Sequence, residues 1–571
     1  MSFVLDAYAA RSCPVKTFNN FDPTATQPPT PLDESLPEQF QGGREHRTRV
    51  LDAIAEKCPQ AVDLRGLEEA DASWQEREQA CLNALADGAP VVIGGVLPVD
   101  LAGHRTGRAD LLVRGGDTAV GGPGYWPVKV KSYLIREKQV KAEHLRFSTV
   151  DDIGTLLPLP GLRYRTRREL ALLEVAHVWR LLETAGFASA TPWGGVIGTD
   201  ETEHTLSSPV ITWVDLGHRF IRTFSRTAAT GYKLRSALER YDHEHGFRVH
   251  VAQEALKRTG DDDPEPPVRP IRIRECESCA WWEVCRPRMD DDDISLRLSK
   301  TPLDVRELQT LVSLGITTVT ELAEADLDSI LPEYLPLTAH RDRSEQRLRQ
   351  AVRRARMVAR GVYLERVTED PIGVPRTTVE VDLDIETTEG DITYLWGVLV
   401  TDRAAQQQEF RHFSAFEDLT PETEIDLAAR FSRWLLQMVD EHPDLLVFHY
   451  SDYETVHLRR LAERSRHPDL LAVLELIPTH FVDLFLFVRD NFVGVEGLGL
   501  KTVAQQGPDF RWRDDEPGGL ASQTWFATAV TDPDPEERTG ARTRVLEYNE
   551  DDVRATWAVR EWLGSSPPAE D

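Results

Sequence analysis

Acidic residues in the last third of the sequence stand at spacings that suit divalent metal ions. In the stretch "VEVDLDIETT" (379–388), Asp382, Asp384 and Glu386 alternate with apolar residues. Alternate residues of a β-strand point to opposite faces, so these acids would share one face. Like charges in a row repel one another, and a divalent cation, which prefers carboxylate oxygens, removes that repulsion. The stretch therefore fits either a metal site or a solvated edge strand.

Two later stretches add further acids. "LLVFHYSDYETVHL" (445–458) begins as an apolar strand and changes into a helix with Glu454 near its start. "LEYNEDDVRATWAV" (546–559) has helical periodicity, so Tyr548 and Asp552, four residues apart, share one helix face. Each stretch alone is common in proteins, but their order and spacing together are more specific.

Together the three stretches resemble the DEDD exonucleases of the RNase H-like fold, including the RNase H-like exonuclease domain often attached to RecB-type proteins. The Asp-x-Glu motif of that family falls on Asp384 and Glu386. The second motif, His-Asn-x-x-Phe-Asp, falls on "HYSDYE" with Glu454 as the acid, and the third, Tyr-x-x-x-Asp, falls on Tyr548 and Asp552. The resemblance implies that these four acids hold two Mg²⁺ or Mn²⁺ ions and that Tyr548 orients the attacking water.

The second motif departs from the family pattern at two positions. Glu454 is one methylene longer than the usual Asp, and Tyr450 replaces an amide that contacts substrate in the family. We interpret Asp483 as the cap of a local turn rather than as a metal ligand. Asp382 and Asp551 rank below the motif acids as ligands.

Three of the six cysteines lie within ten residues, in "CESCAWWEVC" (276–285). The spacing C-x2-C-x5-C is typical of metal binding, although reduced structural cysteines would also fit. Tetrahedral zinc and an iron–sulfur cluster both need a fourth ligand, for which Cys13 is the best distant candidate. Spacing alone does not separate these two cofactors. Cys58 and Cys81 we interpret as ordinary core residues.

An N-terminal Cys-Pro together with C-x2-C-x5-C resembles the iron–sulfur RecB-type nucleases, in which a [4Fe–4S] cluster joins the two ends of the nuclease domain. The resemblance implies a [4Fe–4S] cluster, in preference to the alternative Zn²⁺. Its ligands would be four cysteines: Cys13, Cys276, Cys279 and Cys285.

A further N-terminal stretch resembles the PD-(D/E)xK core of RecB-type proteins. Gly107-x-x-Asp110 supplies the first metal-binding acid, and the next strand reads Pro-Val-Lys-Val-Lys where Pro-Val-Asp-Val-Lys is common. The resemblance assigns catalysis to Asp110 and Lys131, but Lys129 stands where the second carboxylate is expected. Two like charges about 4 Å apart repel by roughly 4 kcal/mol at an intermediate dielectric. We therefore expect a retained fold, a lost metal site, and lysines that bind DNA phosphates.

Other positions of this core are altered as well. The early acid or histidine of the family falls on Glu45 or His46, and a helix motif that usually contains Gln has Glu174 in its place. Alternatively, Glu137 has taken over from the missing carboxylate, which would leave the N-terminal site active.

The elements around these residues predict a multidomain α/β protein. We expect a RecB-like PD-(D/E)xK domain over 1–290 with a linker-like insertion at 259–270, a helical segment over 294–367, an RNase H-like α/β domain over 376–563 and a disordered tail over 564–571. The helical segment contains a helix–Gly315-Ile316–helix pattern that resembles a helix–hairpin–helix, and a plain helical linker fits equally. A long helix is also predicted over 219–257.

The composition describes an ordinary soluble protein with a net charge of −29 and only ten lysines. No apolar run reaches the roughly 18 residues of a membrane helix, and no signal peptide pattern is present, so we expect a cytoplasmic protein without membrane contact. No GxxxxGK loop is present, so a helicase partner would be a separate chain. The sequence thus predicts a metal-dependent DNA exonuclease of 3′–5′ type with an iron–sulfur RecB-like domain. The alternatives are a dual nuclease and a non-catalytic DNA-binding scaffold.

Overall fold

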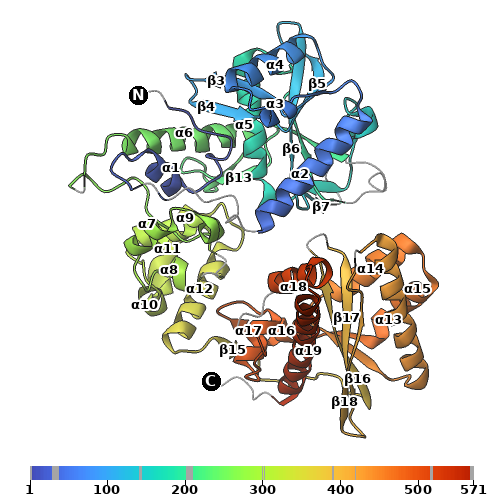
Figure 1. The fold of residues 1–571 in the computed structure, drawn as a ribbon. Helices are drawn as coiled ribbons and strands as arrows, with labels where there is room; N and C mark the ends of the chain where they lie inside the picture. The colour runs from blue at the N-terminus through green and yellow to red at the C-terminus, as the bar shows by residue number, and fades with distance from the viewer. Residues whose placement is uncertain are drawn as a thin grey trace. The chain divides into compact units, whose positions relative to one another are not determined.

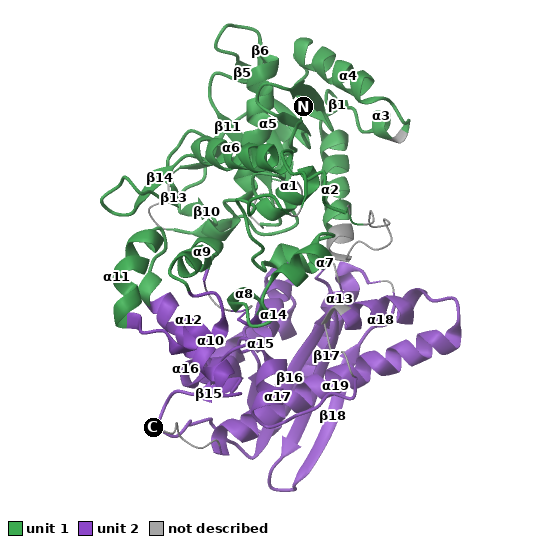
Figure 2. Cartoon of the chain, turned by 90° about the vertical axis from the view of Figure 1, so that its left-hand side faces the viewer, with its two compact units in different colours: residues 1–296, 304–315, 328–345 green, residues 297–303, 316–327, 346–571 purple. Residues whose placement is uncertain are grey.

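The chain divides into two compact units, coloured separately in Figure 2. Unit 1 comprises residues 1–296, 304–315 and 328–345, and unit 2 comprises residues 297–303, 316–327 and 346–571. The segment predicted to be helical over 294–367 is therefore shared between the two units. The computed structural model describes residues 3–26, 28, 38–139, 144–200, 210–260, 262–298, 300, 303–388, 391–417, 419–514 and 519–565.

Unit 1 is built on a mixed sheet with strand order β1-β2-β5-β6-β11-β12-β8-β9 (Figure 1). Its strands are β1 (Val62–Asp63), β2 (Val91–Ile93), β5 (Leu111–Asp117), β6 (Pro123–Val130), β8 (Leu145–Thr149), β9 (Leu157–Pro158), β11 (Trp193–Ile197) and β12 (Val210–Asp215). β6 pairs antiparallel with β5 and parallel with β11. Trp126 and Val128 of β6 belong to the main hydrophobic core of the unit. β6 is therefore an interior strand, as its apolar sequence requires.

Three two-stranded sheets complete the β-structure of unit 1. They pair β3 (Val96–Asp100) with β4 (Arg105–Arg108), β7 (Arg136–Lys138) with β10 (Leu162–Tyr164), and β13 (Ile221–Phe224) with β14 (Tyr232–Arg235). The last pair corrects the long helix predicted over 219–257, because residues 221–235 form a hairpin instead. Gly231 in this hairpin has a φ of +71°, a conformation that favours glycine and interrupts a helix.

The helices of the chain up to residue 338 are α1 (Pro14–Phe21), α2 (Glu38–Lys57), α3 (Gly66–Glu69), α4 (Trp74–Ala86), α5 (Ala171–Ala185), α6 (Ala237–Ala255), α7 (Trp282–Cys285), α8 (Ile294–Arg297), α9 (Val305–Ser313), α10 (Val319–Glu324) and α11 (Leu327–Thr338). α5 is buried along most of its length. Its Val175 and Trp179 pack in the main core, whereas Val178 and Leu182 pack in a second core with α4. A helix between two cores is apolar on most faces, which explains its sequence.

Unit 2 is built on a five-stranded sheet with strand order β18-β17-β16-β19-β20. Its strands are β16 (Val379–Thr387), β17 (Thr393–Asp402), β18 (Gln407–Ser414), β19 (Leu446–His449) and β20 (Phe481–Asp483), and a separate pair joins β15 (Leu364–Arg366) to β21 (Phe492–Gly494). β16 pairs antiparallel with β17 and parallel with β19. β16 is therefore central, and its interpretation as a solvated edge strand is wrong.

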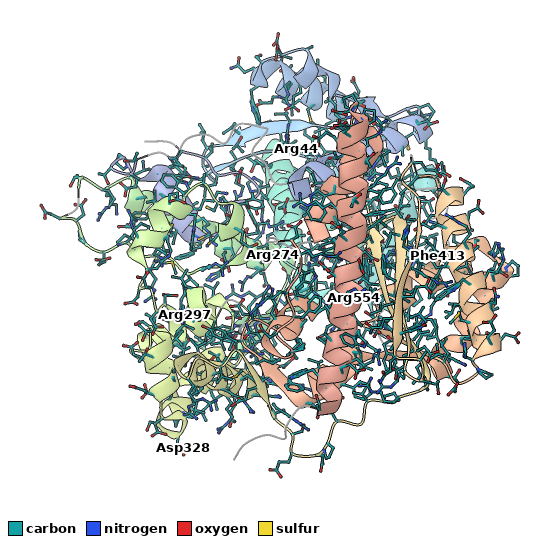
Figure 3. The ribbon with its side chains drawn as sticks, turned by 60° about the horizontal axis from the view of Figure 1, so that its bottom comes forward. Arg44, Arg274, Arg297, Asp328, Phe413 and Arg554 are labelled. Carbon is teal, nitrogen blue, oxygen red and sulfur yellow. The ribbon has the colours of Figure 1, made fainter. Side chains whose placement is uncertain are left out.

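Helices cover both faces of this sheet. Figure 1 shows α13, α14 and α15 on one face and α19 on the other, and Figure 3 shows α19, which carries Arg554, running beside the sheet whose strand β18 carries Phe413. The helices from residue 344 on are α12 (Ser344–Ala359), α13 (Pro421–Glu441), α14 (Tyr453–Ser465), α15 (Pro468–His480), α16 (Leu484–Asn491), α17 (Leu500–Gln506), α18 (Gly519–Thr531) and α19 (Pro535–Ser565). α19 extends into the predicted tail, whose residues 566–571 lie outside the described ranges. Within those ranges, no helix has the length and apolarity needed to cross a membrane.

The two faces of β16 have different partners, as the alternation of its sequence predicts. Val381, Leu383 and Ile385 pack in a core shared with α13 and α14. On the opposite face, the fully buried Arg560 of α19 donates to Asp382 at 3.0 and 2.8 Å and forms an ion pair with Glu380. Arg560 therefore neutralises the first acids of this face and leaves those nearer the end of the strand without that partner.

Candidate metal centre

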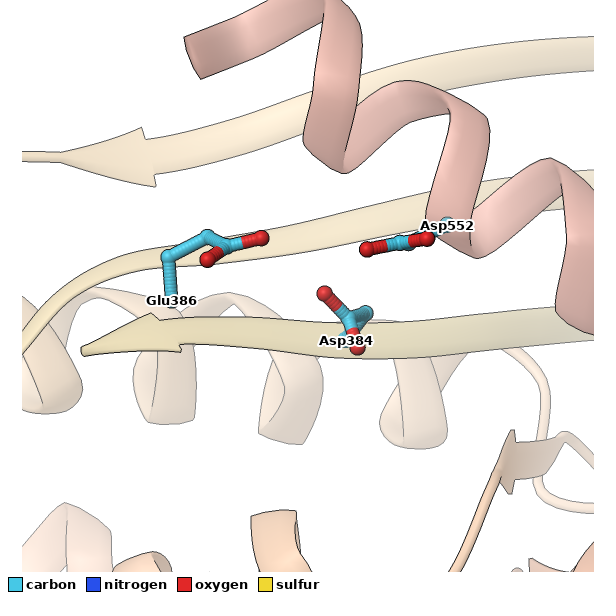
Figure 4. Close-up of side chains that lie close together, drawn as sticks. All are labelled: Asp384, Glu386 and Asp552. Atoms are coloured by element: carbon cyan, nitrogen blue, oxygen red, sulfur yellow. The ribbon is translucent and has the colours of Figure 1, made fainter. Parts of the chain in front are cut away.

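Three carboxylates meet between β16 and α19. Asp384 and Glu386 come from the strand and Asp552 from the helix, and Figure 4 shows their side chains turned toward one another. One oxygen of each lies within 4.8 Å of an oxygen of both others. Glu386 is 6% exposed and Asp552 is 7% exposed. Such a group of buried oxygens suits a divalent cation.

A glycine on the neighbouring strand makes this arrangement possible. Gly397 of β17 is the register partner of Asp384. A side chain at this position would collide with Oδ1 of Asn549, which is fully buried. The space left by Gly397 lets Nδ2 of Asn549 donate a hydrogen bond to Oδ2 of Asp384 at 2.8 Å. Asn549 thus fixes the orientation of this carboxylate.

The other two carboxylates also accept hydrogen bonds from neutral donors. Oγ of Ser522 donates to Oε2 of Glu386 at 2.6 Å, and Nε1 of Trp512 donates to Oδ1 of Asp552 at 2.7 Å. No local pattern pointed to Ser522 or Trp512, because they come from segments outside the three motifs and follow no periodic pattern. Asn549 lies inside the third motif but was not singled out as a site residue. The Asn of the third motif, next to Tyr548, was the one available signal.

Burial makes it unfavourable for all three carboxylates to be ionised together. Burial, followed by the charge of Asp552, raises the pKa of Glu386 to about 8. Burial also raises the pKa of Asp552 to about 6, and it raises the pKa of Asp384 well above its usual range, with Asp552 adding to the effect. The site therefore retains protons near neutral pH, and a divalent cation would displace them.

Glu454, the fourth predicted acid, lies outside this three-carboxylate group. It is in the first turn of α14 and is 3% exposed. Its Oε2 lies 3.6 Å from Nδ1 of His449. Burial lowers the pKa of His449, but the charge of the nearby Glu454 carboxylate outweighs burial and raises it. The second motif thus forms an ion pair of its own, although the charge of Glu454 still contributes to the raised pKa of Asp384.

The remaining residues of these motifs make contacts nearby. Tyr548 is 4% exposed, and its hydroxyl oxygen accepts a hydrogen bond from Nζ of Lys501 at 2.5 Å. Asp483 caps α16 by accepting a hydrogen bond from the N–H of Phe485, as the sequence analysis expected of it. Asp551 pairs with Arg513 at 2.8 Å, away from the three-carboxylate group.

The predicted N-terminal site is occupied by ion pairs. Oδ1 of Asp110 lies 3.4 Å from Nζ of Lys129 and 2.9 Å from Nε of Arg47, and Oδ2 accepts a hydrogen bond from the N–H of Val130 at 2.9 Å. Nζ of Lys129 also donates to the carbonyl of Arg108 at 3.2 Å. The ammonium of Lys129 thus takes oxygen contacts that a metal ion would need.

The second acid of this region is neutralised in the same way. Nζ of Lys131 donates to Oε1 of Glu174 at 2.8 Å, and Arg11 pairs with the same oxygen. Burial raises the pKa of Asp110 and Glu174, but the neighbouring cations, led by Lys129 and Lys131 respectively, bring both below their usual values. Glu137, the proposed replacement acid, pairs with Arg163 instead. Glu45 is exposed and His46 half-buried.

The four predicted cluster cysteines line one cavity of about 20 Å³ in unit 1, formed by Cys13, Cys276, Cys279 and Cys285 with neighbouring residues. Within the described part of the chain, no three cysteine sulfurs lie within 4.8 Å of one another. Four thiolates around one zinc ion would lie about 3.8 Å apart, so this arrangement is not a preformed zinc site. Cys81 is fully buried in the core with α4, and Cys58 is half-buried.

Comparison with known proteins identifies the C-terminal region. A family described as the RNase H superfamily matches residues 381–564, the range that contains all five predicted residues of the C-terminal site. Neither curated proteins nor solved structures give a match. The RecB-like interpretation of residues 1–290 has no support from these comparisons and stays a prediction. Residues 381–564 of this chain form a domain of the RNase H superfamily.

Proposed function

We propose that this protein is a metal-dependent nuclease whose C-terminal domain hydrolyses phosphodiester bonds. The observation that carries the proposal is the group formed by the half-buried Asp384 and the buried Glu386 and Asp552 within an RNase H superfamily domain. Their raised pKa values mean that they need an additional positive charge to ionise together. A divalent cation supplies such a charge and also binds the phosphate oxygens of a nucleic acid.

The residues of the site have separate roles in this proposal. A Mg²⁺ or Mn²⁺ ion held by Asp384, Glu386 and Asp552 would activate water and stabilise the leaving oxygen. Tyr548, beside Asp552, would orient the attacking water. Glu454 would serve a second ion, and its ion pair with His449 would have to open for this. The hydrogen bonds from neutral donors keep the carboxylates oriented without competing for their charge.

DNA is the proposed substrate, with removal of nucleotides from the 3′ end. This part of the proposal rests on the resemblance of the three acidic motifs to the DEDD exonucleases. RNA and opposite polarity are outcomes that the experiment below distinguishes.

Unit 1 is proposed to bind DNA without cutting it. Four cations surround the two buried acids of its predicted site, which leaves positive charge for phosphates; they are Arg11, Arg47, Lys129 and Lys131. The same cations neutralise Asp110 and Glu174, which disfavours the alternative of a second active nuclease site.

The test uses the full chain with single- and double-stranded DNA, and matching RNA, labelled at either end. Wild type should release label in Mn²⁺ or Mg²⁺ and lose this activity in EDTA and in Asp384→Ala. Glu537→Gln, an exposed acid in the first turn of α19, is the matched control and should retain activity. Binding of DNA by wild type without any metal-dependent cleavage would favour the scaffold alternative instead.

A [4Fe–4S] cluster held by Cys13, Cys276, Cys279 and Cys285 is the cofactor proposed for unit 1, supported by their position around one cavity. Protein purified without oxygen should be brown and contain about four irons per chain. Cys13→Ala should lose the colour, whereas Cys58→Ala should keep it. Stoichiometric zinc without iron would contradict this assignment.

A further inference from the structure

One lysine lies beside the three-carboxylate group. Lys501 is the second residue of α17 and is half-buried. Its Nζ is 2.5 Å from the hydroxyl oxygen of Tyr548, 4.7 Å from the centroid of the Tyr548 ring and 5.9 Å from the centroid of the Trp512 ring. In a chain with ten lysines, a half-buried ammonium at this place needs an explanation other than surface charge.

Both aromatic partners of Lys501 belong to the surroundings of Asp552. Trp512 donates to Asp552 through its indole N–H at 2.7 Å, and Tyr548 lies one helical turn before Asp552 on α19. Because Lys501 donates to the Tyr548 oxygen, its ammonium fixes one side of that oxygen and the hydroxyl proton must point away from the lysine. Lys501 therefore restricts the direction of the tyrosine hydroxyl.

The charge of Lys501 also acts on the group at a distance. Its Nζ lies 5.9 Å from the centroid of the Trp512 ring, whose indole N–H donates to Asp552, so a positive charge stands beside the three-carboxylate group. A fixed ammonium that favours ionised carboxylates also repels a divalent cation that binds them. The two effects of Lys501, on the tyrosine and on the cation, can therefore be measured separately.

We propose that Lys501 is a positioning residue of the metal centre, which holds the Tyr548 hydroxyl for catalysis and at the same time weakens binding of the divalent cation. This inference rests on the proposed nuclease function. The proposal predicts two opposite effects: removing the ammonium should tighten metal binding and should slow hydrolysis. A residue with a merely structural role would weaken both.

The experiment measures Mn²⁺ binding by titration calorimetry and single-turnover DNA hydrolysis at saturating Mn²⁺, both on the full chain. Lys501→Met should bind Mn²⁺ about ten-fold more tightly, because a like charge is removed. Its hydrolysis rate should fall about a hundred-fold, because the tyrosine hydroxyl is no longer held in place. Lys501→Arg, which keeps the positive charge, should have the Mn²⁺ affinity of wild type and should retain part of its hydrolysis rate.

Two further variants separate the charge from the hydrogen bond. Lys501→Gln keeps an N–H donor but no charge, so it should bind Mn²⁺ tightly and lose less activity than Lys501→Met. Tyr548→Phe should slow hydrolysis with Mn²⁺ affinity near that of wild type. Lys501→Gln also tests the charge effect if Lys501→Met does not fold.

Failure of this inference differs from failure of the proposed function. If wild type binds Mn²⁺ and cleaves DNA, but Lys501→Met and Lys501→Gln bind Mn²⁺ no more tightly than wild type, the role of Lys501 is refuted. If wild type binds no Mn²⁺, or Asp384→Ala binds it equally well, the metal centre itself is refuted.

Discussion

Both units of this protein hold carboxylates beside a central strand, but the side chains that contact the two groups of carboxylates differ in charge. In unit 1, Asp110 and Glu174 pair with lysine and arginine side chains at 2.8 to 3.4 Å, and their pKa values fall below the usual range. In unit 2, Asp384, Glu386 and Asp552 accept hydrogen bonds from an amide, a hydroxyl and an indole, and their pKa values rise.

The difference shows how similar residue types become structural in one place and suited to catalysis in another. A buried carboxylate whose counter-charge belongs to the chain is satisfied and has little affinity left for a metal ion. A group of carboxylates whose hydrogen-bond donors are neutral is costly to ionise until a cation arrives from solution. The predictions below test this contrast.

The largest effect is expected from removing one ligand of the C-terminal group. Asp552→Ala should lower the rate of Mn²⁺-dependent hydrolysis by at least about 10³-fold, because a three-carboxylate site has no spare ligand. Asp551→Asn, at the neighbouring position that pairs with Arg513, is the matched comparison and should retain most activity. Equal activity of Asp552→Ala and wild type would exclude the C-terminal site.

A decrease in hydrolysis rate smaller than that of Asp552→Ala is expected from Gly397→Ala. The added methyl group collides with Asn549, so this side chain must move away from Asp384. Hydrolysis should fall about a hundred-fold, since small displacements at a reacting centre have effects of this size. Gly540→Ala on α19, where an added Cβ meets nothing within 4 Å, should leave the rate unchanged. Full activity of Gly397→Ala would show that Asn549 does not position Asp384.

The two groups should respond to pH with opposite signs. Raised pKa values stabilise the folded state below the unfolded-state pKa, and this contribution is lost as pH rises through the folded-state value, here up to about 8 for Glu386. In EDTA, the metal-sensitive calorimetric transition should therefore fall by roughly 5 °C or more between pH 5 and pH 8. Saturating Mn²⁺ should reduce this decrease in transition temperature. In EDTA, the decrease should be smaller for Glu386→Gln than for wild type.

For unit 1 the corresponding loss should occur in acid. Asp110 and Glu174 have lowered pKa values, so their contribution is present above the unfolded-state pKa of about 4 and is lost as pH falls below it. Mn²⁺ should not change the transition that responds in this way. A transition that depends on Mn²⁺ and fails only in acid would contradict the contrast between the units.

The smallest effect is expected from rebuilding the N-terminal site. Lys129→Asp in an Asp384→Ala background should gain weak Mn²⁺-dependent cleavage, because Asp110 and the new carboxylate form a pair beside Lys131. The gain should be small because Arg47 and Arg11 still compete for the acids. Lys138→Asp, an exposed lysine of β7, is the control and should gain nothing. Strong activity in Asp384→Ala alone, lost with Lys131→Ala, would mean that the N-terminal site already works.

Local periodicity predicted the parts of the C-terminal site that lie on regular elements. The alternation in β16 placed Asp382, Asp384 and Glu386 on one face, and the four-residue spacing placed Tyr548 and Asp552 on one helix face. The resemblance to the DEDD motifs then singled out Asp384, Glu386, Tyr548 and Asp552, and the structure brings Asp384, Glu386 and Asp552 together. Local periodicity gave no indication of the hydrogen bond from Trp512 or of the position of Lys501, because both depend on segments that meet only in the folded chain. Local spacing also cannot predict the pairing of Asp382 with Arg560, because the two residues are 178 positions apart in the sequence.

Misinterpretations arose where local patterns were compatible with two structures. The alternating acids of β16 fit a solvated edge strand because the sequence does not show that Arg560 neutralises the first two of them inside the fold. The hairpin at 221–235 reads as helix because its strands are short and follow no strict alternation. The predicted role of Glu454 as a metal ligand stays a prediction, and the fold adds that His449 lies 3.6 Å from it, which its local sequence did not indicate.

The pairing of Asp382 with Arg560 also has a consequence for the order in which the protein is made. The strand that carries the acids is synthesised 178 residues before this arginine, a delay of roughly ten to forty seconds at ribosomal rates. During that interval the acids of β16 have neither Arg560 nor Asp552 nearby, and their mutual repulsion keeps an otherwise apolar strand from associating with other nascent chains. The carboxylates that later meet Asp552 thus oppose such association while the partner helix is still being translated.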